Sequence, residues 1–207
     1  SGGKTIWFMH APSVMSKVLL GAPDAASAIS KITGIQVAEN NSQNLLLRAA
    51  PKSTFGGNDL VIYSTSGFTY GHNKTRAPFA APTFAVTDPQ ATPIAIYQSD
   101  GKTAVAMRDF GNWKSVFYGG VGIDAFFFNA LAKEANAWVA TPPGNAVYGN
   151  QHFLTIHALY PGEKKIQLLA PSKVTDLADE KVLSPNTQTL DVEMKFGETR
   201  WFYLQTP

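Results

Sequence analysis

The segment Thr141-Pro142-Pro143-Gly144 separates two parts of the sequence that differ in hydrophobic period. Before it, two stretches place apolar residues at helical spacing, at 24–34 and 123–135, among short apolar strands. After it, no helical period is present, and apolar strands alternate with Pro-Gly and Gly-Glu turns. The sequence therefore predicts an α/β domain at residues 1–144, followed by a small all-β antiparallel sandwich at residues 145–207.

Local signals support both helices. Asp24 is a suitable N-cap for the first, and Gly34 stands where a C′ glycine ends a helix. The second, Ile123–Ala135, has an apolar face of Ile123, Phe126, Phe127, Ala130 and Leu131. The strands predicted in the first part are Ile6–Met9, Ile35–Val37, Leu45–Ala49, Leu60–Tyr63, Thr83–Val86, Pro93–Tyr97, Thr103–Arg108, Lys114–Tyr118 and Ala137–Ala140. Those predicted in the second part are Phe153–Ala158, Lys164–Leu169, Val174–Leu177, Thr189–Met194 and Arg200–Leu204.

Composition narrows the class of protein. Hydrophobic residues make up 44% of the 207 residues and charged residues 15%, as expected for a chain with a substantial core. The net charge is +2 and no run of Lys or Arg exists, so charge gives no argument for nucleic acid or an anionic membrane as partner. The absence of cysteine excludes disulfides, thiolate metal sites and a cysteine nucleophile. It leaves the compartment open, although we favour a bacterial secreted or periplasmic location.

Gly120 to Ala125 matches the dinucleotide-binding pattern G-x-G-x-x-A between a predicted strand and a predicted helix. Such a site also needs an acidic residue at the end of the next strand, to bind the ribose. That strand, Ala137–Ala140, is followed by Thr and Pro, and Asp124 would repel a pyrophosphate. We therefore interpret the glycines as a strand-to-helix turn and expect no cofactor, with no NAD(P) bound at Gly119–Gly122.

The residues that commonly carry hydrolytic chemistry do not form a recognisable set. The four histidines (His10, His72, His152 and His157) are scattered and lack the spacing of a zinc site. The acidic residues fall mostly in turns and helix starts, which gives no pair of carboxylates for glycoside hydrolysis. No G-x-S-x-G elbow is present. We therefore assign no catalytic or metal-binding residue and expect the chain alone to lack glycosidase and glutaminase activity.

A long polar loop, Ser64–Pro82, carries the one group of residues that suggests a ligand. Phe68, Tyr70, His72 and Arg76 combine aromatic faces, which stack on sugars, with polar groups that bind hydroxyls. They are our candidates for a ligand-binding lip. The alternative is a loop that buries its own aromatic side chains or packs against a neighbouring domain.

The order of segments resembles a known family. "WFMHAP", "DAASAISKITGIQV", "TPIAIYQSDGKTAVAMRDFGNWKSVFYGGVGIDAFFFNALAKEANAWV", "VYGNQHFLTIHALYPGEKKIQLLAPSKVTDL" and "FGETRWFYL" follow one another as in the region after the catalytic barrel of β-galactosidase-like glycoside hydrolases. The resemblance covers nearly the whole chain. It implies a flavodoxin-like domain, similar to class I glutamine amidotransferases and called a trimerisation domain in one β-galactosidase family, followed by a small β domain.

The resemblance also limits what can be inferred about activity. Class I amidotransferases use a cysteine nucleophile, which this chain lacks, and the catalytic carboxylates of the hydrolases would lie on the barrel. No functional residue is carried over. The expected function is a non-catalytic accessory or oligomerisation portion of a glycoside hydrolase-like protein, with the parent's catalytic barrel, a second copy or a carbohydrate as partner. The alternative is a free-standing sugar- or nucleotide-binding α/β domain.

Overall fold

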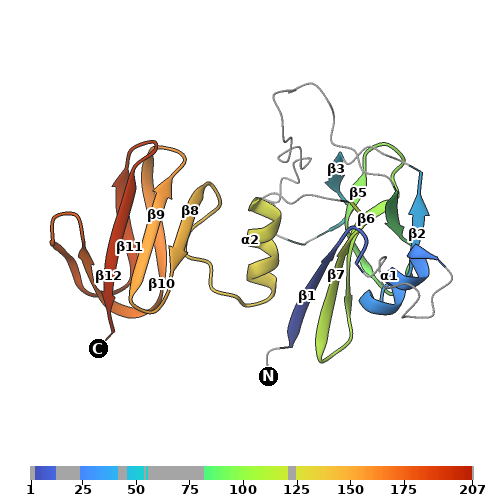
Figure 1. Ribbon diagram of the computed structural model, residues 1–207, viewed down its shortest axis with the longest axis horizontal. Coiled ribbons are helices and arrows are strands. Elements are labelled where there is room, and N and C mark those ends of the chain that lie inside the picture. Colours follow the sequence, from blue (N-terminus) through green and yellow to red (C-terminus); the bar gives the residue numbers. More distant parts are fainter. Residues whose placement is uncertain are drawn as a thin grey trace. The chain divides into compact units, whose positions relative to one another are not determined.

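The computed structural model describes residues 3–12, 24–41, 46–53, 55, 82–120 and 125–206. The chain divides into two compact units, Ser1–Ala135 and Asn136–Pro207, each with its own core (Figure 1). The domain limits 1–144 and 145–207 remain a prediction.

A five-stranded mixed sheet forms the centre of the first unit. Its strands lie in the order β1-β7-β6-β5-β3 (Figure 1). Only β1 and β7 run parallel, and every other neighbouring pair is antiparallel. The strands are β1 (Lys4–Met9), β3 (Leu47–Ala49), β5 (Thr92–Tyr97), β6 (Thr103–Asp109) and β7 (Trp113–Tyr118).

This topology shows that the predicted α/β flavodoxin-like, amidotransferase-like domain is wrong. A flavodoxin-like sheet is built from parallel strands joined by helical crossovers of a dozen or more residues. Here β5, β6 and β7 follow one another through the short turns at 98–102 and 110–112, which can join only antiparallel neighbours. The first unit is therefore mostly β, with two helices among its described residues.

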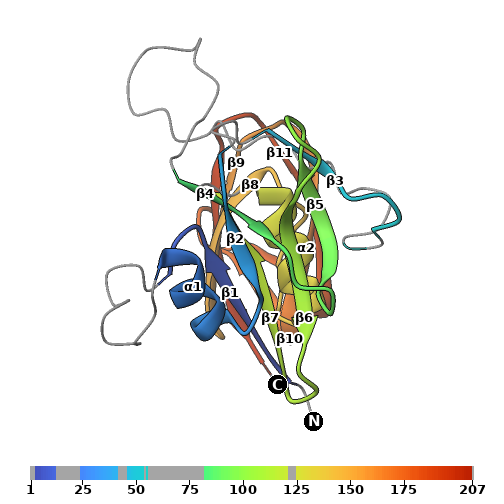
Figure 2. The same ribbon diagram turned by 90° about the vertical axis from the view of Figure 1, so that its right-hand side faces the viewer.

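Both faces of this sheet are covered. Helix α1 (Ala25–Thr33) packs on β7 and on β2 (Val37–Asn40), and β2 pairs with β4 (Thr83–Val86) in a small antiparallel ribbon (Figure 2). On the opposite face, helix α2 (Ala125–Glu134) buries Phe127 and Leu131 in the core. Neither helix is long and apolar enough to cross a membrane, which holds for the described residues.

The local signals for α1 are confirmed. The Asp24 carboxylate accepts a hydrogen bond of 2.7 Å from the Ser27 N–H, and Gly34 has the left-handed conformation of a C-terminal cap. The face predicted for α2 needs correction, because Phe126 is 43% exposed rather than buried.

The second unit contains five strands in one antiparallel sheet, in the order β11-β10-β12-β9-β8 (Figure 1). The bounds are β8 (Asn145–Gly149), β9 (Phe153–Ala158), β10 (Gly162–Asp176), β11 (Val182–Met194) and β12 (Thr199–Gln205). Ile166 and Leu168 share one core with Ile156 and Phe202. The described part of the second unit thus has one sheet and one core, where a sandwich of separate sheets was predicted.

Two strand predictions fail for a local reason. Two predicted strands, Lys164–Leu169 and Val174–Leu177, fall on one long strand that ends at Asp176, since Ala170-Pro171 forms an irregularity in β10 and not a break. Even-numbered residues face the core on both sides of it. Ala137–Ala140 is not a regular strand, although the Ala140 carbonyl accepts a hydrogen bond of 2.7 Å from the Gln167 N–H.

Candidate functional site

The second unit contains a cleft of about 320 Å³ between the start of β8 and the start of β10. Its size lies at the lower end of the range typical of small-molecule sites. It lies wholly within the second unit. The residues that line it are Thr141, Pro142, Pro143, Gly144, Asn145, Tyr160, Glu163, Lys164 and Lys165.

Lys164 supplies a buried positive charge to this cleft. It is 8% exposed and occupies the same face of β10 as the core residues Ile166 and Leu168. Its Nζ donates a hydrogen bond of 2.7 Å to the Tyr160 carbonyl oxygen. No carboxylate of the described residues lies within ion-pair distance of it. Because lysine is rarely buried without a partner, an ammonium held this way is unusual.

Asn145, which also lines the cleft, supplies a buried acceptor. Its Oδ1 is shielded from solvent and has no hydrogen-bond partner in the described part of the chain. The preceding residue, Gly144, has a φ of 106°, which an L side chain rarely adopts. A Cβ at Gly144 would also lie 3.1 Å from the Tyr160 ring. The turn that delivers Asn145 to the cleft therefore requires glycine.

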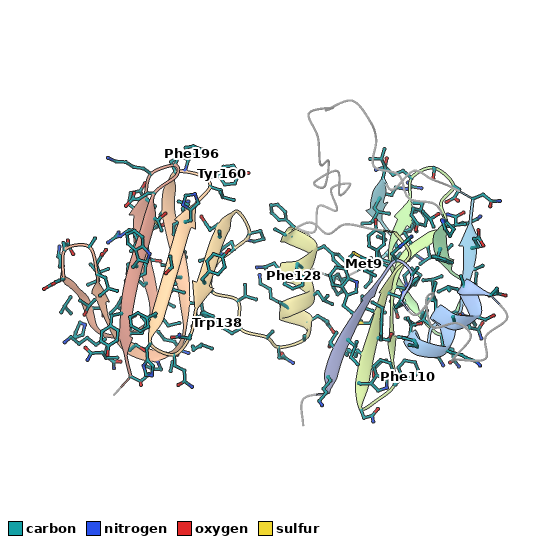
Figure 3. All side chains as sticks on the ribbon, viewed as in Figure 1. Met9, Phe110, Phe128, Trp138, Tyr160 and Phe196 are labelled. Carbon is teal, nitrogen blue, oxygen red and sulfur yellow. The ribbon has the colours of Figure 1, made fainter. Side chains whose placement is uncertain are left out.

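Aromatic side chains are exposed at the same end of the second unit. Tyr160 is 65% exposed and Phe196 76% exposed, and both stand at the turns that follow β9 and β11 (Figure 3). A hydrogen bond of 2.8 Å from the Gly197 N–H to the Ala158 carbonyl holds these turns together. With Pro142 and Pro143, Tyr160 gives the cleft an apolar surface beside its polar groups.

The predicted ligand-binding lip is not part of this cleft. Phe68, Tyr70, His72 and Arg76 lie outside the described residues. Their role, and the loop at Ser64–Pro82 that carries them, remain predictions.

Gly119 has a structural role at the glycine-rich turn. A Cβ there would lie 1.7 Å from the Phe84 carbonyl oxygen, so β4 approaches the backbone of Gly119 too closely for any side chain. The Gly119 carbonyl accepts a hydrogen bond of 2.9 Å from the Phe84 N–H. This supports the interpretation of a turn. Residues 121–124 lie outside the described part, and the absence of NAD(P) binding remains a prediction.

The described histidines lie in separate environments. His10 Nε2 is 2.9 Å from the Pro82 carbonyl oxygen, and His157 Nδ1 is 2.8 Å from Thr199 Oγ1. His152 precedes β9, and its carbonyl accepts a hydrogen bond from Leu204. Among the described residues, no group of three or more His, Asp or Glu side chains could hold a metal ion.

A buried ion pair in the first unit is structural. The Asp88 carboxylate accepts hydrogen bonds from the Gln36 and Gln90 N–H groups and from Arg108 Nη1 at 2.8 Å. Burial acts to raise the pKa of the Asp88 carboxyl, but these donors outweigh it and the pKa lies below its ordinary value. Because Arg108 also binds the Gly34 carbonyl, the pair joins the end of α1 to β6.

No family model matches the chain, and no curated protein matches it. Among solved structures, a β-galactosidase from Bacillus circulans sp. alkalophilus gives a TM-score of 0.54 at 15% identity, covering 98% of this chain and 29% of that one. A β-galactosidase from Rahnella sp. R3 gives 0.48 at 14% identity, covering 97% and 29%. A catalytic mutant of a GH42 β-galactosidase from G. stearothermophilus gives 0.48 at 13% identity, covering 99% and 28%.

Of these three, the first alone exceeds a TM-score of 0.5, and at 15% identity it shows likeness of fold. The chain spans 29% of the length of that β-galactosidase. The coarser part of the predicted resemblance is thereby confirmed, since the chain is similar in fold to a region of a β-galactosidase-like protein.

Proposed function

We propose that this chain is a non-catalytic accessory portion of a glycoside hydrolase-like protein, which supports carbohydrate hydrolysis by a catalytic barrel elsewhere in its parent. The observation that carries the proposal is the similarity to a β-galactosidase over 98% of this chain but 29% of the larger one. A likeness that covers both units favours relatedness along the whole chain over a chance match of one sheet.

Exposed apolar side chains in the first unit support a contact with a partner. Met9 at the end of β1 is 43% exposed and Phe128 on α2 is 54% exposed (Figure 3). Phe126 on the same helix is 43% exposed. Trp7 links β1 to α2, with its ring centroid 6.1 Å from that of Phe128. Met9 lies on the same face of β1 as Trp7, and we name Met9 and Phe128 the β1–α2 patch. Apolar groups gathered in this way favour a protein interface, and we assign the patch to the barrel or to a second copy of the chain.

The coding sequence provides the first test. The reading frame upstream of the codon for Ser1 should encode a region long enough for a barrel. A coding sequence that contains no region long enough for a barrel, before or after this segment, would overturn the proposal.

Binding of the two parts provides the second test. The upstream region and this chain, produced separately, should associate in calorimetry, and the pair but not this chain alone should hydrolyse an aryl β-galactoside. Phe128→Asp should weaken the association, whereas Phe196→Asp, a matched change at a more exposed phenylalanine of the second unit, should not. Turnover by this chain alone that a point mutation within it abolishes would contradict a non-catalytic role.

A further inference from the structure

We infer that the cleft between β8 and β10 binds an acidic sugar, a uronate, through Lys164, Asn145 and Tyr160. This goes beyond the proposed function and does not depend on it, because the cleft lies within the second unit and uses neither a barrel nor the β1–α2 patch.

The charge of the ligand follows from Lys164. Transfer of an ammonium from water into a protein is unfavourable unless an anion or several acceptors compensate for the lost hydration. Lys164 is 8% exposed, and its one hydrogen-bond acceptor among the described residues is the Tyr160 carbonyl. Two of its three N–H donors remain for a ligand. A carboxylate supplies both the acceptors and the opposite charge.

Glu163 also lines the cleft but does not neutralise this ammonium. It is exposed, and no ion pair joins it to Lys164. Lys165 is also exposed and lines the cleft, and its positive charge balances the negative charge of Glu163. The net charge of the lining residues is therefore the single positive charge of Lys164, which favours a ligand with one carboxylate.

The hydroxyl groups of the ligand follow from Asn145. Its buried Oδ1 accepts no hydrogen bond from the described residues and requires a donor. A carboxylate cannot donate, so a simple organic anion would leave this atom unsatisfied. A sugar hydroxyl can donate to it, and the exposed Tyr160 ring with Pro142 and Pro143 offers an apolar surface to the C–H face of a sugar. Carboxylate, hydroxyl and C–H face occur together in a uronate.

Calorimetry on the 207-residue chain at low ionic strength tests the inference, with sodium galacturonate as the probe. Galactose, which has a hydroxymethyl group in place of the carboxylate, tests the charge, and acetate tests the need for hydroxyl groups. We expect galacturonate to bind with a millimolar dissociation constant and both controls to bind about tenfold more weakly or not at all. Equal binding of galactose or of acetate would overturn the inference, as would no binding of galacturonate.

Three variants locate the site. Lys164→Met keeps an unbranched side chain and removes the charge, so it should weaken galacturonate binding about tenfold. Lys173→Met, on an exposed position of the same strand, is the matched control and should leave binding unchanged. Tyr160→Ala changes a 65% exposed ring, keeps the carbonyl that binds Lys164, and should weaken binding even if Lys164→Met fails to fold. Binding unaffected by both Lys164→Met and Tyr160→Ala would place it outside the cleft and overturn the inference.

Discussion

Replacement of Gly119 by alanine should destabilise the first unit more than any other glycine-to-alanine change in its described part. The Gly119 N–H donates a hydrogen bond of 2.9 Å to the Ala104 carbonyl, and its own carbonyl accepts one of 2.9 Å from Phe84. An added Cβ would lie 1.7 Å from the Phe84 carbonyl oxygen and 2.6 Å from its carbon. These are backbone atoms of a strand, so no side chain can rotate away to make room.

The size of the effect follows from what must move. Phe84 is fully buried, and its displacement disturbs the packing between β4 and α1. Overpacking of this kind costs about 1–3 kcal/mol, and loss of one backbone hydrogen bond adds about 1 kcal/mol. The expected decrease in the free energy of unfolding is therefore about 2–4 kcal/mol, which lowers the melting temperature of a unit of this size by about 6–15 °C.

Calorimetry and amide hydrogen exchange followed by mass spectrometry measure this effect, because exchange reports on the two units separately. Gly101→Ala is the control, since Gly101 has a positive φ of 71° but no atom within 4 Å of an added Cβ. Gly101→Ala should lower the free energy of unfolding by about 1 kcal/mol, from backbone strain alone. Protection of the second unit should not change in either variant. A Gly119→Ala chain no less stable than the Gly101→Ala chain would refute the reasoning.

Two further predictions concern polar contacts of the first unit. Asp88→Asn should lower stability at pH 7 by about 2 kcal/mol, because the charged bond to Arg108 is lost. Since the folded-state pKa of Asp88 lies below 3.8, its contribution is complete above pH 3.8 and is lost as the pH falls through the folded-state value, so the melting temperatures of variant and native chain should converge in acid. Asp24→Ala removes the acceptor for the Ser27 N–H at the start of α1, so the free energy of unfolding measured in urea should fall by about 1 kcal/mol. Asp24→Asn keeps a side-chain oxygen and should lower it less.

The parts of the fold that depend on neighbouring residues could be predicted from the sequence. Asp24 and Gly34 marked the ends of α1 because capping uses atoms within a few residues of the helix end. Strands such as β4 and β9 have the predicted bounds, since apolar runs between turn residues leave few alternatives.

The class of the first sheet could not be read from the same signals, because strand direction depends on partners far apart in the sequence. Two helical stretches among the strands led to the prediction of an α/β domain, and the resemblance implied a flavodoxin-like one. The short connections between β5 and β6 and between β6 and β7 were sufficient to exclude it. Connection length was therefore a better guide to strand direction than the order of element types.

The candidate cleft was missed because each of its residues is of a type that is common at its position in the sequence and indicates no ligand. A lysine in a strand is usually exposed, and Thr141–Gly144 was interpreted only as the boundary between two domains. One signal was present: Lys164 has the same parity as Ile166 and Leu168, which places its side chain on the buried face of β10. No comparable signal identified Asn145, because β8 was not predicted at all.

The cleft and the glycine-rich turn illustrate opposite relations between a motif and its function. Gly120 begins the pattern of a ligand-binding motif, and at the neighbouring Gly119 the contact with the Phe84 backbone accounts for the absence of a side chain. Asn145 belongs to no motif, yet its buried Oδ1 has no hydrogen-bond partner in the described part of the chain. A residue whose chemistry the fold already satisfies gives no reason to expect a ligand, whereas an unsatisfied buried group does. For this reason the search for a ligand should begin at β8 and β10.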